Sequence, residues 1–171
     1  MSVALFDGFL SSPEMVAVFD DGAMVQAMFD FEQALAQAQA AHGVIPASAA
    51  RAIAGVCKAS LYDIPALVRA GRRAGSLAIP LVKELTAAVA LYDEEASTFV
   101  HRGSTSQDVI DTAMVLVTRE ALGLIERDLA RLVDALLALA EQHLDTPVLA
   151  RTLMQPAQVS KAKFDVSRFA E

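Results

Sequence analysis

One long stretch of helical periodicity, residues 106–143, constrains the fold of this chain more than any other feature. It contains a single glycine and no proline, and Asp145, Thr146 and Pro147 end it. A helix of this length measures roughly 55 Å at 1.5 Å per residue, which is longer than one globule of 171 residues needs. Its apolar residues recur at helical spacing: Ile110, Ala113, Met114, Val117, Ala121, Leu124, Leu132, Leu136 and Ala140.

Further apolar residues widen this surface beyond one stripe. They are Leu116, Ile125, Leu129, Val133, Leu137 and Leu139. A helix that is apolar on several sides is typical of the interior of a bundle. We therefore expect this helix to be buried between subunits, in a homo-oligomer.

Composition supports an all-α fold. Hydrophobic residues make up 54% of the chain and mean hydropathy is +0.41, and much of this excess is alanine, a strong helix former. No apolar run approaches the length of a membrane span, and no basic region leads into an apolar core at the N-terminus, so we expect a cytoplasmic protein without a membrane partner. The net charge of −7, with no basic cluster, argues against nucleic acid as a partner. The single Cys57 is expected to be a small buried hydrophobe.

Capping residues and first-turn prolines predict a series of shorter helices before the long one. The expected helices run from Pro13 to about Phe19, from Asp20 or Asp21 to just before Gly43, from Ala47 to Lys58, from Ile64 to about Ala70, and from Ile79 to about Leu91. The second of these carries the expected core stripe Met24, Met28, Phe31, Leu35 and Ala38. Residues 71–77 are expected to form a loop, and Asp93, Glu94 and Glu95 a solvated connection.

The long helix is preceded by a stretch with the composition of an anion site. Gly103, Ser104, Thr105, Ser106 and Gln107 should form a tight turn that presents backbone N–H groups and hydroxyls at the helix N-terminus. His101 and Arg102, just before them, add a titratable group and a fixed positive charge, which suits a substrate rich in carboxylates. Serine and threonine at a helix start are also common as plain caps, and the residues alone leave both readings open.

A second polar segment follows the long helix. Arg151, Thr152 and Gln155 could extend a carboxylate-binding surface. From Val159 onward the chain changes to a short tail of mixed charge without extended periodicity. The domain organisation expected from these features is an N-terminal helical domain, 1–104, the start of a long-helix bundle domain, 105–158, and a divergent tail, 159–171.

Several segments in this order resemble the N-terminal part of the fumarase/aspartase superfamily, and within it the cycloisomerases that lactonise 3-carboxy-cis,cis-muconate. The segments are residues 71–77 followed by Ala78-Ile79-Pro80-Leu81-Val82-Lys83, then His101-Arg102-Gly103-Ser104-Thr105-Ser106-Gln107-Asp108 with Asp111-Thr112-Ala113, then Arg151-Thr152 with Gln155. The resemblance covers about residues 1–158. It implies an all-helical subunit, a tetramer built around long helices, active sites shared between subunits, and no cofactor or metal.

Carried over residue by residue, His101, Ser104, Thr105, Ser106 and Gln107 match the superfamily's first active-site segment, and Arg151, Thr152 and Gln155 match the second. Two positions depart from the pattern. Many relatives have a histidine where this chain has Leu153, and close muconate-cycloisomerase relatives have one where it has Pro156. The third segment, a mobile serine-rich loop, matches no stretch of these 171 residues.

The resemblance implies an intramolecular addition within a small polycarboxylate, in the protocatechuate branch of aromatic catabolism. One carboxylate attacks a C=C bond, and the carbon alpha to another carboxylate is protonated, giving 4-carboxymuconolactone. His101 is the candidate proton donor, and His42 and His143 lie near helix ends. Because one segment is altered and one is missing, we expect little activity from these residues alone, as part of a truncated chain. Two alternatives stay open: an inactive helical association module, and a superfamily lyase acting on an amino-dicarboxylate or its nucleotide adduct.

Overall fold

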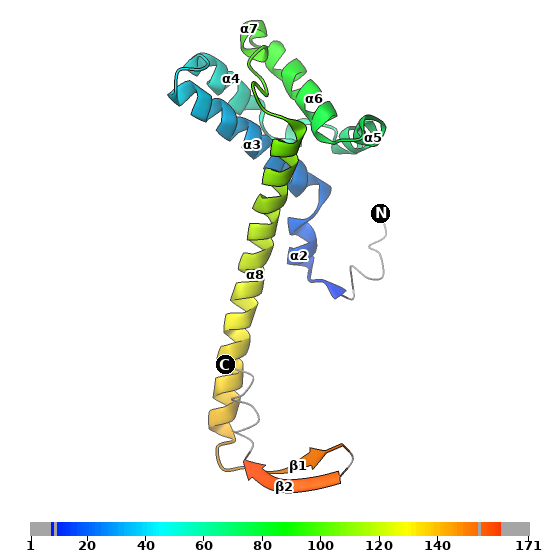
Figure 1. Cartoon of the computed structure of the whole chain (residues 1–171), viewed down its shortest axis with the longest axis vertical. Helices are drawn as coiled ribbons and strands as arrows, with labels where there is room; N and C mark the ends of the chain where they lie inside the picture. Colours follow the sequence, from blue (N-terminus) through cyan, green and yellow to red (C-terminus); the bar gives the residue numbers. More distant parts are fainter. Residues whose placement is uncertain (1–7, 9, 154, 162–171) are drawn as a thin grey trace. The chain divides into compact units, whose positions relative to one another are not determined.

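The computed structural model describes residue 8, residues 10–153 and residues 155–161. The chain divides into two compact units, Met1–Ala121 and Leu122–Glu171. The first holds α2 to α7 and the first part of α8, and the second holds the rest of α8 and a two-stranded hairpin (Figure 1). The all-α fold expected from the sequence is confirmed, with this hairpin as an addition. No helix in the described part of the chain combines the length and hydropathy that a membrane span needs.

Most helices begin where the capping residues predict. The elements are α2 (Pro13–Val18), α3 (Asp21–Ala41), α4 (Ala47–Val56), the short 3-10 helix η1 (Ala59–Leu61), α5 (Ile64–Ala74), α6 (Ala78–Ala90), α7 (Glu94–Ser97) and α8 (Ser106–Gln142). The side chains of Ser12, Asp20, Asp63 and Asp93 each accept a hydrogen bond from the backbone N–H three residues later. Each of these bonds satisfies one N–H that the helix itself leaves unpaired.

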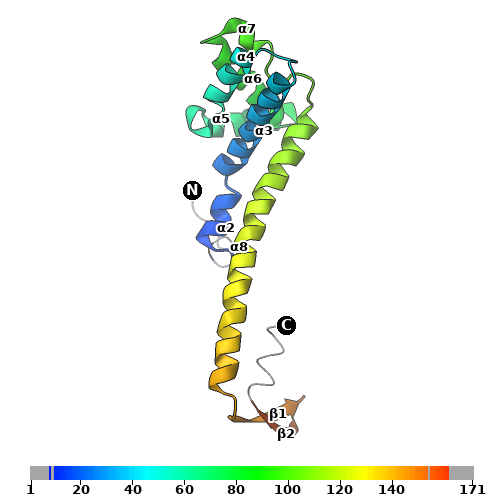
Figure 2. The ribbon, with the colours of Figure 1, turned by 90° about the vertical axis from the view of Figure 1, so that its left-hand side faces the viewer.

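The core of the first unit lies among α3, α4 and α6. α3 packs mainly on α4, α4 also contacts α6 and α7, and α5 lies against α6 (Figures 1 and 2). Phe29 and Met28 from α3, Ile53 from α4, and Leu81 and Leu85 from α6 are its largest fully buried apolar side chains. Phe29 also stacks on Tyr62, with ring centroids 4.6 Å apart.

The buried face of α3 differs from the expected stripe. Val25, Phe29, Glu32 and Ala36 are buried together with Ala27 and Met28, so of the five predicted positions only Met28 is fully buried. The observed face is rotated by about one residue, or about 100°, from the predicted one. The pattern was misread because the true stripe contains a carboxylate, and charged residues are seldom found in a core.

The loop predicted for residues 71–77 is wrong over its first half. α5 continues through Gly71 to Ala74, and Gly75, at φ 75°, ends it. Gly71 is buried because Leu77 crosses it: a Cβ on Gly71 would lie 3.2 Å from the Leu77 Cα. Gly71 therefore permits the close approach of Leu77 to α5, and the turn that ends α5 lies further along the chain, at Gly75.

Two other segments differ from expectation. Glu94 and Glu95 are exposed, as expected, but they belong to a helix, because Asp93 caps α7, a four-residue helix that begins at Glu94. Strands β1 (Pro147–Thr152) and β2 (Gln155–Lys161) pair antiparallel where no strand was expected. β2 crosses the expected start of the tail at Val159, and residues 162–171 lie outside the described residues. The boundary between the two compact units lies inside α8, after Ala121. The expected domain organisation, with a boundary after residue 104, stays a prediction.

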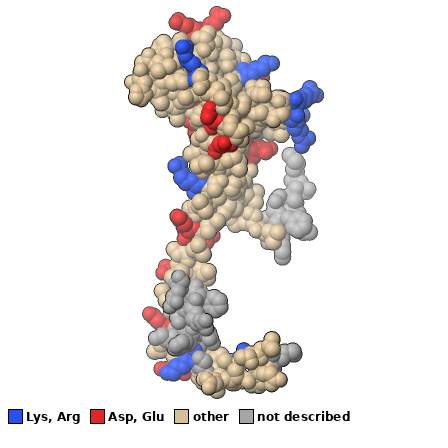
Figure 3. Space-filling model, in the orientation of Figure 1, with Lys and Arg blue, Asp and Glu red and all other residues tan. Residues whose placement is uncertain are grey.

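The long helix is present as predicted, from Ser106 to Gln142. In the first unit it buries Val109, Ala113, Val117 and Ala121, which are spaced by four residues. In the second unit several large apolar side chains are exposed: Leu122, Ile125, Leu129, Leu132, Leu137 and Leu139. Charged side chains are scattered over the face drawn in Figure 3, with wide uncharged areas between them. α8 therefore carries more apolar surface than the described residues cover.

Candidate functional site

The turn between α7 and α8 is built on two left-handed residues. His101 has φ 56° and Gly103 has φ 71°, and the Ser104 N–H donates to the His101 carbonyl at 3.4 Å. Glycine adopts such a conformation without penalty, whereas it is uncommon for a residue with a side chain, histidine included. The turn brings Ser104 and Thr105 to the N-terminus of α8.

Asp108 already occupies part of the expected anion site. Its Oδ2 accepts hydrogen bonds from the Thr105 N–H at 2.8 Å, the Thr105 hydroxyl at 2.9 Å and the Ser104 hydroxyl at 3.3 Å. These bonds, those from Thr105 first, hold the pKa of the exposed Asp108 carboxyl below its ordinary range. Of the two readings that the sequence left open, a ligand site or a plain cap, the structure shows these hydroxyls in capping bonds. The three donors nevertheless converge on one carboxylate oxygen.

Other donors of the turn remain open. The backbone N–H groups of Ser106 and Gln107, the first two positions of α8, have no acceptor among the described residues. The Gln107 side chain is engaged, because its Nε2 donates to Asp111 Oδ1 at 2.5 Å. An anion at this end of α8 would therefore meet two backbone donors and the positive end of the helix dipole.

His101 is held by a buried carboxylate that the sequence argument overlooked. Its Nδ1 lies 2.6 Å from Oε1 of Glu32, which is 1% exposed, while the His101 side chain is 17% exposed. Burial raises the pKa of Glu32, and the neighbouring His101 opposes part of that rise. The available signal was the spacing of Val25, Phe29, Glu32 and Ala36, which places Glu32 on an apolar face.

Arg102 is also tied to α3, through its backbone. Gln39 Nε2 donates to the Arg102 carbonyl at 2.6 Å, and the guanidinium carbon of Arg102 lies 5.5 Å from the centroid of the Phe99 ring. α3 therefore fixes residues 101 and 102 through two side chains, Glu32 and Gln39.

The residues of the second segment lie on the hairpin of the second unit. Thr152 pairs with Gln155 and Arg151 with Pro156, and all four are exposed. Leu153, in the connection between the strands, has φ 50° and is fully exposed. The structure thus brings Arg151, Thr152 and Gln155 together, in a unit separate from that of the first segment.

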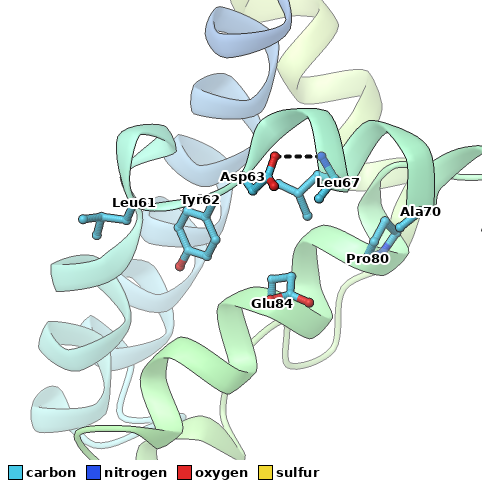
Figure 4. Close-up of a pocket in the computed structure, with 8 residues that line it drawn as sticks. Leu61, Tyr62, Asp63, Leu67, Ala70, Pro80 and Glu84 are labelled. Atoms are coloured by element: carbon cyan, nitrogen blue, oxygen red, sulfur yellow. Dashed lines mark hydrogen bonds between the residues drawn. The ribbon is translucent and has the colours of Figure 1, made fainter.

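A pocket of about 340 Å³ is lined by residues of other elements (Figure 4). Its walls come from η1, α5 and α6, with Tyr62, Asp63 and Glu84 as polar members, and Asp63 is engaged as the cap of α5. Burial raises the pKa of Tyr62 to about 12, and its hydroxyl donates to the Val56 carbonyl at 2.9 Å. A neighbouring pocket of about 550 Å³ is lined by Arg69, Arg73 and Lys83 among others. Sequence reasoning singled out neither pocket.

The remaining candidate groups are placed as follows. Cys57 is buried, as expected, and burial together with the nearby Glu32 raises its pKa to about 12, so it stays a thiol. His143 Nδ1 lies 3.3 Å from the Thr146 hydroxyl, and His42 is the C-terminal cap residue of α3. Among the described residues, no group of three His, Cys, Asp or Glu side chains is placed to hold a metal ion.

Curated relatives support the resemblance carried by the motifs. The chain is 48% identical over 157 residues to the 3-carboxy-cis,cis-muconate cycloisomerase of Pseudomonas putida, covering 92% of this chain and 37% of the relative. It is 53% identical over 148 residues to the enzyme of the same name from Bradyrhizobium diazoefficiens, covering 86% and 33%. It is also 44% identical over 155 residues to a nitrosuccinate lyase of Streptomyces davaonensis, covering 88% and 33%. The chain thus spans about a third of the length of the relatives it matches.

Solved structures and a family match agree with these relatives. The 3-carboxy-cis,cis-muconate lactonizing enzyme of Pseudomonas putida superposes with a TM-score of 0.92 at 44% identity, covering 97% of this chain and 38% of that one. The β-carboxy-cis,cis-muconate cycloisomerase of Acinetobacter calcoaceticus gives a TM-score of 0.93 at 38% identity, covering 97% and 39%. Residues 10–162 match the family described as Lyase. This chain therefore belongs to the lyase family of the fumarase/aspartase superfamily.

Proposed function

We propose that this chain supplies the first and second substrate-binding segments of an enzyme that lactonises 3-carboxy-cis,cis-muconate to 4-carboxymuconolactone. The observation that carries the proposal is the turn before α8, where the backbone N–H groups of Ser106 and Gln107 have no acceptor among the described residues. The identity of 48% to the Pseudomonas putida cycloisomerase supports this substrate class. A carboxylate-binding turn is what this reaction needs, because its substrate and product carry several carboxylates.

In the reaction, one carboxylate oxygen of the substrate forms a C–O bond to a carbon of a C=C bond. The π electrons move onto the carbon alpha to another carboxylate, and that carboxylate shares the charge until the carbon takes a proton. We assign the N–H groups of Ser106 and Gln107, with the Ser106 hydroxyl, to this carboxylate, because fixed donors stabilise charge as it develops. Ser104 and Thr105 donate hydrogen bonds to Asp108 and so stabilise the turn. They can bind the substrate only if a substrate carboxylate displaces the carboxylate of Asp108.

His101 is the candidate general acid. It directly precedes the turn, and Glu32 holds its ring through Nδ1, which leaves Nε2 without a partner among the described residues. In the imidazolium form, Nε2–H can deliver the proton to the alpha carbon and regain one from solvent. His42 and His143, at helix C-terminal ends, are outside this turn.

Arg151, Thr152 and Gln155 are assigned to a second carboxylate of the substrate. Arginine binds a carboxylate with two parallel hydrogen bonds, and the three side chains share one exposed hairpin. Leu153 and Pro156 stand where the superfamily resemblance implies histidines. We therefore assign substrate binding, and no proton transfer, to this segment, and His101 is the candidate proton donor.

A chimera tests the proposal. Residues 10–158 of this chain replace the matching third of the Pseudomonas putida enzyme, and the loss of 3-carboxymuconate absorbance is followed. We expect the chimera to turn over this substrate. His101→Ala should lower that turnover by a factor of about 10² to 10⁴, as for the loss of a general acid. A chimera that folds and assembles but does not lactonise refutes the proposal. The isolated chain is expected to give little turnover, because no segment of it matches the third active-site segment.

A lyase reaction on an amino- or nitro-dicarboxylate is the second candidate, favoured by the 44% identity to nitrosuccinate lyase. The same chimera offered nitrosuccinate and adenylosuccinate decides between the two. A third outcome, in which the chimera assembles and binds substrate but turns over none of these compounds although the third segment is present, identifies this chain as an inactive association module.

We further infer a homo-oligomer, a tetramer if it follows its superfamily, that works in the cytoplasm with a small polycarboxylate and without a cofactor. The exposed leucines and isoleucine of α8 support the association, because contiguous exposed apolar surface of this kind is typical of interfaces. The family reaction is redox-neutral and moves one proton, so it requires no electron carrier.

A further inference from the structure

The interior of the first unit holds a charged side chain that packing alone does not explain. Glu32 is the only buried charged residue among those described, at 1% exposed, in a face of α3 that otherwise consists of valine, phenylalanine and alanine. A carboxylate in such a place costs stability unless it is paired. Its hydrogen-bond partner is Nδ1 of His101, at 2.6 Å and 69 residues away in the sequence.

The same face of α3 makes a second contact with the turn. Gln39, seven residues after Glu32 and so two helical turns along, donates from Nε2 to the carbonyl of Arg102 at 2.6 Å. The backbone between the two contacts takes the left-handed conformation at His101. Glu32 therefore fixes the imidazole, and Gln39 fixes the backbone that carries it.

We propose that Glu32 is a positioning residue, whose carboxylate accepts the Nδ1–H of His101 and so holds the neutral ring in the tautomer with a free Nε2 lone pair. This inference rests on the proposed role of His101 in proton transfer. A carboxylate acceptor selects the protonated nitrogen by hydrogen bonding and fixes the ring plane.

The consequence for the reaction is a proton that can leave only from Nε2. When His101 is charged, both nitrogens carry protons, and the one at Nδ1 is bound by Glu32. Transfer from Nε2 to the alpha carbon then leaves the tautomer that Glu32 already stabilises, without rotation of the ring. The charge on the imidazolium is compensated by the Glu32 carboxylate in the meantime.

Other charged groups near the pair do not compete for Nδ1. Asp108 acts on His101 through space, but its Oδ2 is engaged by Thr105 and Ser104. Cys57 and Asp30 lie close enough to interact electrostatically with each other, and Cys57 also with Glu32, but neither is hydrogen-bonded to the histidine. The carboxylate of Asp30 accepts from Gln26.

Nitrogen NMR of the 171-residue chain, labelled with ¹⁵N-histidine, tests the proposal without any substrate. The spectra are recorded above the range in which imidazole titrates, and His101 is distinguished from His42 and His143 by its loss in His101→Gln. We expect the wild-type His101 to be protonated at Nδ1 and unprotonated at Nε2. Protonation at Nε2 instead overturns the proposal, because Glu32 would then act as the donor.

Substitutions of Glu32 test whether its carboxylate selects the tautomer of His101. Glu32→Leu, which removes the acceptor and keeps an apolar side chain in the core, should shift His101 towards protonation at Nε2. Glu32→Gln, a weaker acceptor, should reduce the Nδ1–H population and serves where the leucine variant does not fold. Asp30→Asn, on the exposed side of the same helix, is the matched control and should leave the spectrum unchanged. An unchanged His101 spectrum in a folded Glu32 variant overturns the proposal.

Activity in the chimera gives an independent measurement. Glu32→Gln should lower kcat by about 10- to 100-fold with little change in KM, as for other partners that orient a functional histidine. If the chimera does not lactonise but the NMR result is as expected, the proposed function fails and the positioning role of Glu32 stands. If lactonisation occurs and Glu32→Gln changes neither kcat nor the spectrum, only the positioning role fails.

Discussion

The carboxylate of Asp108 accepts two hydrogen bonds from Thr105, one from the backbone N–H at 2.8 Å and one from the hydroxyl at 2.9 Å. A weaker bond returns from the Asp108 N–H to the Thr105 hydroxyl at 3.4 Å. This reciprocal arrangement is a capping box, with an aspartate in the position usually taken by glutamate.

Asp108→Ala should lower the stability of the first unit in a pH-dependent way. Because hydrogen bonds from Thr105 depress the folded-state pKa of Asp108 below its ordinary 3.8, its contribution is present above pH 3.8 and is lost as pH falls through the folded value. The difference in Tm between wild type and variant should therefore be full at pH 6 and shrink below pH 3.8. Asp111→Ala is the control, and a difference independent of pH would contradict the assignment.

Glu32→Gln should change stability with the opposite sign of pH dependence. Burial raises the folded-state pKa of Glu32 above its ordinary 4.5, so its favourable contribution is present below pH 4.5 and is lost as pH rises through the folded value. The free energy of unfolding of the variant, relative to wild type, should therefore increase as pH rises from 4.5. Chemical denaturation at several pH values measures it, with Glu84→Gln on the exposed side of α6 as control. A relative stability that falls with pH would show that His101 outweighs burial.

Gly71→Ala should destabilise the contact between α5 and the start of α6. Alanine gains about 1 kcal/mol of helix propensity over glycine. Its Cβ, however, would lie 3.2 Å from the Leu77 Cα and 3.3 Å from its Cδ1, and overpacking of this kind costs about 1 to 3 kcal/mol. Gly55→Ala, in α4, has no atom within 4 Å of the new Cβ and should stabilise by up to about 1 kcal/mol. Equal effects of both substitutions on urea unfolding would contradict this reading of Gly71.

Lysine substitutions on the exposed face of α8 should weaken self-association. Leu122, Ile125, Leu129 and Leu132 follow one another at steps of three and four, and each is about half exposed. Leu129→Lys with Leu132→Lys places two charges in this stripe, and sedimentation velocity should show smaller species than wild type at the same concentration. Asp134→Lys with Glu141→Lys, both exposed, changes the charge by a larger amount outside the stripe and should leave the assembly intact. A wild-type chain that sediments as a monomer at micromolar concentration refutes the oligomer.

Ser106→Ala and Thr105→Val should separate ligand binding from helix capping. In the chimera, Ser106→Ala should raise KM or lower kcat and leave Tm unchanged, because Ser106 lies inside the helix and makes none of the capping bonds to Asp108. Thr105→Val removes the hydroxyl that caps α8 and should lower stability by about 0.5 to 2 kcal/mol. If neither substitution changes turnover or binding of a tricarboxylate analogue, the turn is a cap only.

The sequence alone determined the helical architecture and its boundaries where local chemistry decides them. Ser12, Asp20 and Asp63 cap helices as their spacing predicts, and α8 runs unbroken from Ser106 because no proline interrupts it. The turn at Gly103 could also be located, because glycine followed by hydroxyl residues before an apolar run is a local signal of a helix start. The resemblance of the chain to the fumarase/aspartase superfamily, which the comparisons confirm, rests on the same local motifs.

Only the tertiary structure decided which face of α3 is buried and what holds His101. The carboxylate of Glu32 lies in the core because it is paired there with His101, 69 residues away in the sequence, and no local pattern contains that pairing. In the same way, Gly71 is buried because Leu77 crosses it, and the hydroxyls of Ser104 and Thr105 are engaged because Asp108 turns back onto them. Propensity and periodicity describe how a segment satisfies its own backbone, whereas burial of a charge and close approach of two helices depend on residues brought together by the fold.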